Sequence, residues 1–456
     1  MTPIRREVRT LVRLAIPVAV AQLASMTLWM VDVVMVGRVG VDALAASSLG
    51  RSWIMATVVL GMGLVFGIDP IASQAFGARD RKRLSLSVQT ALVVAGAASL
   101  PVGLSWLGTQ KGLEWLGQEA HLSQLAHDYV LVQLPGLPFF LAFIAIQHWL
   151  QGRGIMRPAM WVTFAANGIN ILANWVLIFG KWGFPALGLL GAGIATSITQ
   201  IFMPLALLFL VRRYRLGRGG WLGWSREALK LRQIRPMLVY GFPVAMTVGL
   251  ELWAFALTTV LSGVIGKVEL ATHTIVVTLA SLSFMLPLGI SIAAVTRVGN
   301  LVGARETEKA KRAAWVAFGL GAGVMVVSAV VFIAGRHTLP LWFGASREVA
   351  LLSALILPIA SAFQIFDGIQ VVGAGILRGL GRTRPAVVFN FIAYYVLALP
   401  LSCWWIFVHK GGLGGLWWSM CLGLGVVAVL MMLWVWRRWP EDLPQKLTSE
   451  SSTIGS

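Results

Sequence analysis

Three acidic residues lie deep inside apolar stretches of this chain, at Asp32, Glu251 and Asp367. A charged side chain at the centre of a bilayer costs at least about 2.5–3.5 kcal/mol, so a carboxyl group at that depth needs a reason to be there. The chemistry that such groups offer is the binding and release of a proton or a small cation. We therefore treat the three acids as candidate ion sites. The alternative is that each makes a structural hydrogen bond or stays neutral.

The depth of each acid follows from the basic residues that flank its helix, because an α-helix rises about 1.5 Å per residue. Asp367 lies 11 residues before Arg378, which places it about 16 Å from that end and close to the middle of a bilayer. Glu251 is 16 residues from the nearest basic residue on either side and is also central. Asp32 lies 6 residues, or about 9 Å, from Arg38 and is nearer to one surface.

Two carboxylates at a similar depth cannot both stay ionised at low cost in a medium of low dielectric constant. Glu251 and Asp367 are therefore expected to bind a proton or to share a cation such as Na⁺, and this pair is the only metal site that we expect.

Polar and aromatic residues accompany the acids at helical spacing. Gln22, Ser25 and Trp29 share one helix face with Asp32, and Asn167, Asn170 and Asn174 share one face of another apolar stretch. We expect such residues to line a substrate cavity, while hydrogen bonding between helices is the alternative. The expected lining residues are Gln22, Ser25, Trp29, Asn170, Asn174, Trp253 and Gln364.

Two prolines lie within long apolar stretches, Pro17 and Pro243. Each removes one helical hydrogen bond, so both are candidate hinges. Proline is also common in membrane helices for purely structural reasons, and the sequence does not separate the two roles.

The composition determines what kind of scaffold holds these residues. Of 456 residues, 57% are hydrophobic and only 12% are charged, with a mean hydropathy of +0.79. These values exclude a disordered chain, a secreted disulfide scaffold and an ordinary cytosolic enzyme. Cys403 and Cys421 both lie in apolar stretches, which predicts core packing and leaves the redox compartment open. The chain is expected to be an integral membrane protein.

Apolar stretches of about 20 residues predict twelve membrane-spanning helices. Counting Lys and Arg by side places 29 of the 37 with the two termini and the loops on their side, and the positive-inside rule then places both termini in the cytoplasm. Most of the net charge of +19 therefore reflects topology, and no nucleic acid partner is expected. The predicted spans are 14–36, 44–68, 86–108, 124–150, 158–180, 187–211, 237–263, 270–295, 313–334, 349–377, 385–408 and 412–436.

An internal repeat relates the two halves of the chain. An offset of 226 residues aligns IPVA at 16–19 with FPVA at 242–245, Gly63 with Gly289, and GARD at 77–80 with GARE at 303–306. The acids break this symmetry, because Asp32 aligns with Thr258 and Glu251 with Ser25. Packing common to both halves does not require them, which favours a functional role.

The repeat predicts an all-α integral membrane protein with twelve transmembrane helices in two pseudo-symmetric six-helix bundles. We expect an N-terminal lobe over 1–211, a cytoplasmic linker over 212–236, a C-terminal lobe over 237–437 and a cytoplasmic tail over 438–456. An even number of spans per repeat relates the lobes by an axis along the membrane normal.

The segment IPVAVAQLASMTLWMVDVVMVGRVG, the GARD loop and its GARE counterpart resemble the multidrug and toxic compound extrusion (MATE) family, in its NorM-like branch. The resemblance covers essentially the whole chain. It implies two lobes around a central cavity and the export of cationic or amphipathic drugs, driven by inward flow of H⁺ or Na⁺. It also implies that Glu251 and Asp367 are the cation-site acids of the second lobe and that Asp32 is the first-helix aspartate. Phe363 departs from the tyrosine of some Na⁺-coupled members, which favours H⁺.

The residue pattern disfavours two other function classes. A flippase for a lipid-linked precursor needs basic residues deep in its cavity for the pyrophosphate, and no Lys or Arg is predicted near mid-span. A membrane-embedded transferase needs paired acids for Mg²⁺, and no such spacing occurs. The sequence has no GxxxxGK[ST] nucleotide loop and no HExxH zinc motif, so we expect no cofactor and no enzymatic activity. The expected partners are drugs, the coupling ion and membrane lipid, for a monomer in a bacterial-type inner membrane. The coupling ion and the drug range stay open.

Overall fold

The computed structural model describes residues 2–439, and these residues form helices without any β-strand. The tail expected over 438–456 lies outside this range from residue 440 onward. Short helical turns occur at Leu134–Gly136 (η1), Arg226–Leu229 (η2), Leu339–Phe343 (η3) and Ile392–Ala398 (η4). The α-helices are α1 (Pro3–Gly37), α2 (Val41–Val65), α3 (Ile68–Gly77), α4 (Arg81–Leu107), α5 (Thr109–Trp115), α6 (Ala120–Leu131), α7 (Leu137–Gly152), α8 (Arg157–Phe179), α9 (Gly188–Arg213), α10 (Leu231–Ile265), α11 (Lys267–Gly303), α12 (Thr307–Ala334), α13 (Arg347–Gly379), α14 (Arg384–Phe391), α15 (Leu399–Phe407) and α16 (Gly412–Arg437).

Twelve helical segments among the described residues are long and apolar enough to cross a membrane, which confirms the predicted number. Three of them are composite: α2 runs into α3, α6 and α7 are joined through η1, and α14 and α15 are joined through η4. Several helices extend beyond the predicted apolar stretch. α1 begins at Pro3, well before the predicted start at 14, because a helix continues through charged turns that lie outside the hydrocarbon layer.

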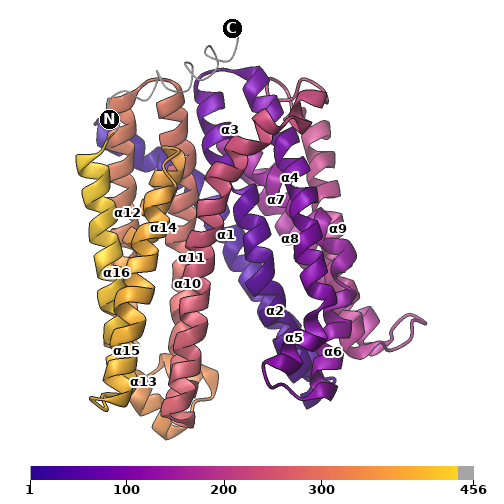
Figure 1. Ribbon diagram of the computed structural model, residues 1–456, viewed down its shortest axis with the longest axis vertical. Helices are drawn as coiled ribbons and strands as arrows, with labels where there is room; N and C mark the ends of the chain where they lie inside the picture. The colour runs from indigo at the N-terminus through magenta and orange to yellow at the C-terminus, as the bar shows by residue number, and fades with distance from the viewer. Residues whose placement is uncertain (1, 440–456) are drawn as a thin grey trace. The chain divides into compact units, whose positions relative to one another are not determined.

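The helices gather into two compact units (Figure 1). Among the described residues, unit 1 contains 2–19, 73–79 and 246–439, and unit 2 contains 20–72 and 80–245. The two units therefore do not coincide with the two halves of the sequence. The start of α1 and the end of α3 belong to the first half of the sequence but group with the second half in space. Residues 212–245 group with the first half. α1 and α10 each pass from one unit to the other, between residues 19 and 20 and between 245 and 246.

Glycines of the repeat explain why these segments pack where they do. In unit 2, any side chain at Gly63 would collide with the backbone of Ala245. In unit 1, a Cβ atom at Gly289 would lie 2.9 Å from both the carbonyl oxygen of Ala15 and Cβ of Ala19. The offset of 226 aligns Gly63 with Gly289 and Ala19 with Ala245. The same close helix contact therefore occurs once in each unit, as small residues permit.

A second pair of glycines repeats the pattern within unit 1. A side chain at Gly77 would strike the carbonyl oxygen of Asn300, and one at Gly303 would strike that of Gln74. These residues are again related by the offset of 226. The GARD and GARE loops thus begin at points where two helix ends touch backbone to backbone.

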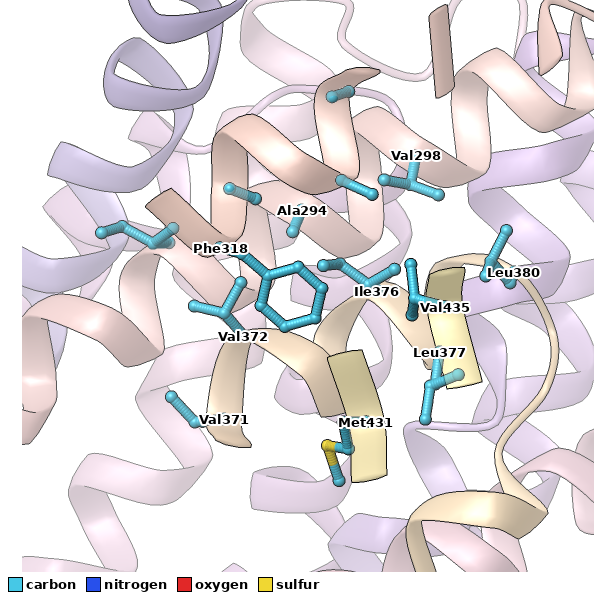
Figure 2. Packing of buried hydrophobic residues seen from close by; sticks show 14 of the residues in the cluster. Ala294, Val298, Phe318, Val371, Val372, Ile376, Leu377, Leu380, Met431 and Val435 are labelled. Atoms are coloured by element: carbon cyan, nitrogen blue, oxygen red, sulfur yellow. The ribbon is translucent and has the colours of Figure 1, made fainter. Parts of the chain in front are cut away.

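The core of unit 1 is formed where α11, α12, α13 and α16 meet. Figure 2 shows the ring of Phe318 beside Val372 and Ile376, with Met431 of α16 on the neighbouring helix. Alanines at 310, 313, 314 and 317 form a stripe along α12 and are fully buried. Their small size lets the helices approach closely, as is usual where the surrounding solvent is lipid. This core holds α13, which carries Asp367.

The segment 212–236 is folded onto unit 2. Gln89 of α4 donates from Nε2 to the carbonyl oxygen of Gly223 at 2.7 Å, and its Oε1 accepts from the backbone N–H of Ser225 at 2.7 Å. The hydroxyl of Ser85 accepts from the N–H of Leu222 at 3.0 Å. Side chains of α4 therefore satisfy the backbone of this segment, and α10 begins at Leu231.

Candidate functional site

The acids Asp367 and Glu251 both belong to unit 1, on α13 and α10. Asp367 is 5% exposed, and Glu251 is half-buried and interacts with it electrostatically. The structure thus brings together the two acids that the sequence placed at one depth. Two interacting carboxyl groups in an apolar surrounding favour uptake of a proton or of a cation.

Gln370 extends this acid pair. It lies three residues after Asp367, so both side chains project from one face of α13. Its Nε2 donates to Oε2 of Glu251 at 3.2 Å, which ties α13 to α10 at the level of the acids. Oε1 of Gln370 is buried and accepts no hydrogen bond within the described residues. The amide therefore presents a free oxygen beside two carboxyl groups.

Tyr394 is the third component of the site. Its side chain is fully buried, and it interacts electrostatically with Glu251 and Asp367. The phenolic oxygen has no hydrogen-bond partner in the part of the chain that the structure describes. An unpaired buried hydroxyl is costly, so Tyr394 is a candidate member of this site together with the two acids. From the sequence alone, Phe363 of α13 was noted because it stands where some related chains carry a tyrosine, whereas Tyr394 was not predicted as a site residue.

A π-helical turn, η4, carries Tyr394. The turn ends just before Pro400, which has no N–H to donate and whose ring crowds the carbonyl four residues earlier. Widening the helix by one residue relieves this conflict, and such π-turns are frequent at functional sites. Tyr395 uses the same distortion, since its hydroxyl donates to the carbonyl oxygen of Leu250 at 3.1 Å. The residue before the acid on α10 is thereby fixed to the π-turn.

Aromatic rings form a connected cluster with Tyr394 in unit 1. The ring of Phe255 lies 6.0 Å from that of Phe363 and 6.5 Å from that of Tyr394, and Phe363 lies 5.5 Å from Trp417. Gln364 is fully buried one residue further along, and neither of its amide atoms has a partner among the described residues. Apolar rings with a few convergent polar groups are typical of small-molecule and ion sites.

Asp32 belongs to a separate polar chain in unit 2. Asn174 donates from Nδ2 to Oδ1 of Asp32 at 2.5 Å and to Oδ1 of Asn170 at 2.8 Å. Asn170 in turn donates to the hydroxyl of Thr199 at 3.3 Å. Both asparagines and Thr199 are buried, and Oδ1 of Asn174 accepts no bond within residues 2–439. Three helices, α1, α8 and α9, therefore contribute oxygen atoms to one location.

Arg51 is the positive charge nearest to this chain. It lies in α2, ten residues after Val41 and therefore about 15 Å along the helix, which contradicts the prediction that no Lys or Arg lies near mid-span. It interacts electrostatically with Asp32, and its guanidinium lies 5.7 Å from the centre of the Trp29 ring. Asp32 thus has a cationic neighbour that the acids of unit 1 do not share.

The remaining expected lining residues differ in what they contact. Ser25 bonds the carbonyl oxygen of Ala21 in its own helix, at 3.0 Å, and Gln22 is half-buried. Asn167 donates to the carbonyl oxygen of Ala24 at 2.9 Å, so it joins α8 to α1 through the helix backbone. Trp253 lies along α10 beside Gly249. The structure therefore gives Asn170 and Asn174 direct contact with the polar chain of Asp32, and gives Ser25 and Asn167 bonds to helix backbone.

A buried pair outside the predicted set links Asp69 and His148. Oδ1 of Asp69 lies 2.6 Å from Nδ1 of His148, and both side chains are almost fully buried in unit 2. The ring of Phe66 covers the imidazole, with centroids 4.5 Å apart. Asp69 follows the end of the predicted span 44–68 and His148 lies two residues before the end of the span 124–150, so neither was predicted to be deep in the membrane.

Candidate ligands for a metal are oxygens. No group of three or more His, Cys, Asp or Glu side chains gathers anywhere in residues 2–439. The oxygens of Glu251, Asp367, Gln370 and Tyr394 in unit 1, and of Asp32, Asn170, Asn174 and Thr199 in unit 2, are hard donors. Such donors suit Na⁺ or a transferable proton better than Zn²⁺.

Comparison with known proteins gives one consistent result. A profile of the family described as MatE matches residues 17–176 and 243–404. The Multidrug resistance protein NorM of Burkholderia vietnamiensis is 34% identical over 433 residues, which cover 93% of this chain and 92% of that protein. An uncharacterized transporter of Schizosaccharomyces pombe is 34% identical over 428 residues, covering 93% of this chain and 78% of that protein.

Two solved structures share the fold. The eukaryotic MATE transporter AtDTX14 superposes with a TM-score of 0.88 at 24% identity, covering 95% of this chain and 96% of that one. A mutant of the Vibrio cholerae MATE transporter VcmN gives a TM-score of 0.88 at 19% identity, covering 97% and 99%.

Proposed function

The chain belongs to the MatE family, the multidrug and toxic compound extrusion transporters, and from this premise we propose that it exports cationic or amphipathic organic compounds in exchange for H⁺ or Na⁺. The observation that carries the proposal is the buried cluster in unit 1. Glu251 and Asp367 interact there, Gln370 bonds Glu251, and Tyr394 contributes an unpaired hydroxyl. Acids at this depth inside a helical membrane protein are expected to serve ion movement.

The cluster supplies a physical route to coupling. Binding of a proton or Na⁺ neutralises the acid pair, while binding of an organic cation needs the charge. If drug and ion exclude each other, or favour opposite-facing states, then inward ion flow drives outward drug flow, because the linkage between the two sites is reciprocal. The preference for H⁺ over Na⁺ rested on Phe363, and Tyr394 supplies a phenolic oxygen near the same acids. Both ions therefore stay within the proposal.

Alternating access is the transport cycle that we propose, with the two halves of the repeat moving relative to each other. Both termini and the segment 212–236 are assigned to the cytoplasmic side of a bacterial-type inner membrane, on the charge count. Pro17 and Pro243 are assigned as hinges, since α1 and α10 each pass between the compact units two residues after these prolines. The working form is proposed to be the monomer, with export conferring drug resistance.

The substrate class follows from the charges. Three acids and several exposed aromatic rings attract organic cations, and Trp29 is 46% exposed. The alternative, a lipid-linked precursor flippase, requires a cluster of deep cations. Arg51 lies deep but is engaged with Trp29 and with the hydroxyl of Ser47 at 3.3 Å. A single engaged arginine favours the drug exporter.

The test is gradient-driven efflux of an ethidium-like dye from proteoliposomes. Glu251→Gln and Asp367→Asn remove charge without adding volume, so both are expected to abolish efflux driven by an imposed gradient. The matched control is Glu348→Gln, which changes an exposed acid at the start of the same helix as Asp367. The control should export at the wild-type rate. Wild-type efflux in both cluster variants would contradict the mechanism.

The ion is identified in the same vesicles. Replacing Na⁺ by K⁺ at constant ΔpH leaves the efflux unchanged if H⁺ is the coupling ion, and abolishes it if Na⁺ is. Selective binding of a pyrophosphate lipid, with no response to cationic dyes, would favour the flippase.

A further inference from the structure

A cavity of about 510 Å³ lies in unit 2, where α7 and α9 end and α4 begins. Its apolar wall comes from Val88 and Leu92 of α4, Ile146 of α7, and Leu208 and Val211 of α9. Leu92 lies 11 residues after the first residue of α4, or about 16 Å along the helix axis. The wall therefore extends from the end of the helices well into the depth of the hydrocarbon layer.

The other part of the cavity is basic. Arg212, Arg215 and Arg218 all line it, together with Trp149 and Trp221. The three arginines are exposed, no acidic residue lines the cavity, and none of the three forms an ion pair with any acid in the part of the chain described. Three exposed guanidinium groups and two tryptophans therefore share one cavity with an apolar wall. This is the distribution of a membrane interface.

The rim is held in place by Arg153, at the end of α7. Its guanidinium donates to the carbonyl oxygen of Leu216 at 2.6 Å and to that of Arg218 at 3.0 Å. The same group lies 4.7 Å from the centre of the Trp149 ring, which lines the cavity. Trp149 in turn donates from Nε1 to the carbonyl oxygen of Leu84 at 3.2 Å. The loop that carries Arg218 is therefore fixed to α7 and α4.

The end of α9 also positions the arginines. The N–H of Leu216 bonds the carbonyl oxygen of Val211 at 2.9 Å, and the N–H of Arg215 bonds that of Arg212 at 3.2 Å. This is a Schellman ending, whose left-handed residue is usually glycine. Here Arg215 takes that place with φ of 51°. The chain thus accepts a less favourable backbone in order to present a third arginine at the turn.

The repeat shows that the shared scaffold does not need this construction. At the offset of 227 that aligns 152–159 with 379–386, Arg153 corresponds to Leu380 and Trp149 to Ile376. Both counterparts are buried apolar residues in the core of unit 1. The arginine–tryptophan support of the cavity is therefore particular to unit 2.

We propose that this cavity is a binding site for an anionic phospholipid. The phosphate is held by Arg212, Arg215 and Arg218, because guanidinium groups match phosphate oxygens in geometry and charge. An acyl chain lies along Val88, Leu92 and Leu208. Basic pockets between helices at the cytoplasmic side of a membrane bind such headgroups, and this site lies on the side assigned to the cytoplasm by the charge count. The site is separate from the acids that carry the proposed transport function.

The test measures retention of phosphatidylglycerol by the full-length chain, purified in detergent and analysed by native mass spectrometry. The variant R212Q/R215Q/R218Q is expected to bind phosphatidylglycerol about 100-fold more weakly, since each basic residue near an anionic surface contributes about fivefold. The matched control R226Q/R232Q/R235Q removes the same charge from exposed positions nearby in unit 2. The control should bind within about threefold of the wild type, and phosphatidylcholine should bind weakly throughout.

A third variant separates the lipid from free phosphate. Leu92→Trp fills the apolar part of the slot, so it should weaken retention of phosphatidylglycerol without altering any response to inorganic phosphate. Equal loss in the control variant would show diffuse attraction to the basic surface and would overturn the site. Binding of inorganic phosphate as tight as that of the lipid, with no effect of Leu92→Trp, would overturn the assignment to a lipid. Undiminished lipid binding by R212Q/R215Q/R218Q would overturn the proposal altogether.

Discussion

Replacing Gly63 by alanine tests the packing that joins the start of α10 to α2. The added Cβ atom would strike both the backbone and the side chain of Ala245, so no side-chain rotation relieves the clash and the two helices have to separate. Forcing a methyl group into a closely packed contact costs about 1–3 kcal/mol. For a domain of this size, each kcal/mol lowers the melting temperature by about 2–4 °C. We therefore expect Gly63→Ala to melt about 2–12 °C below the wild type.

The chain offers an internal control of the opposite sign. Gly96 in α4 and Gly319 in α12 are helical glycines with nothing within 4 Å of an added Cβ atom. Alanine in place of glycine within a helix is worth about 0.5–1 kcal/mol when there is space for it. Gly96→Ala and Gly319→Ala should therefore melt at or above the wild-type temperature, although the chemical change is identical.

The assay heats the protein in detergent and measures the monodisperse fraction by size-exclusion chromatography. Gly289→Ala is the symmetry-related test in unit 1 and should behave like Gly63→Ala, because Ala15 and Ala19 surround it. If Gly63→Ala and Gly289→Ala were as stable as the variants at Gly96 and Gly319, the close helix contacts described for the two units would be wrong.

Three further predictions follow from individual contacts. Cysteines introduced at Ser225 and at Gly344 should react with an impermeant maleimide from opposite sides of the membrane, and labelling from one side would disprove the proposed topology. Tyr394→Phe removes a hydroxyl that no described residue bonds, so the melting temperature should stay at the wild-type value. Gradient-driven efflux should fall at least about tenfold, which corresponds to the loss of one hydrogen bond to a charged group. Unaltered efflux would exclude the hydroxyl from the ion site. Glu7→Gln disrupts a bidentate pair with Arg297 at 2.6 and 2.9 Å and should destabilise the protein by about 1.5–3 kcal/mol, the range for hydrogen bonds to charged groups. Adding Arg297→Gln should cause little further loss, and additive losses in this double-mutant cycle would show that the pair does not interact.

The number of spans and the identity of the unit 1 acids could be predicted because hydropathy and helical rise are local properties. Twelve apolar stretches give twelve candidate spans, and the spacing from Arg378 and Arg235 was sufficient to place Asp367 and Glu251 at similar depth. The repeat also revealed Gly63 and Gly289 as a matched pair. It did not show what they contact, because the residue touching each one comes from the other copy of the repeat.

Other parts of the site depend on structure that a single sequence does not display. Tyr394 joins the acids through a π-helical turn, and one extra residue in a turn changes which side chains share a face. The predicted span 44–68 contained Arg51 seven residues after its start, whereas α2 begins at Val41 and carries this residue further inward. The arginines of the 212–218 segment were interpreted only as topology signals, since the cavity that they line is formed together with distant parts of α4 and α7.

The passage of α1 and α10 between the compact units also affects the order in which the protein can assemble during synthesis. Unit 2 is complete once residue 245 has been made, because its last segment is the start of α10. The first 19 residues belong to unit 1, and the glycine against which they pack is residue 289. At about 5–20 residues per second, that glycine follows Ala19 by roughly 14–54 s. The segment that ends at Ala19 therefore waits through the synthesis of all of unit 2 before Gly289 is available to it, and during this interval the first helix is only partly packed.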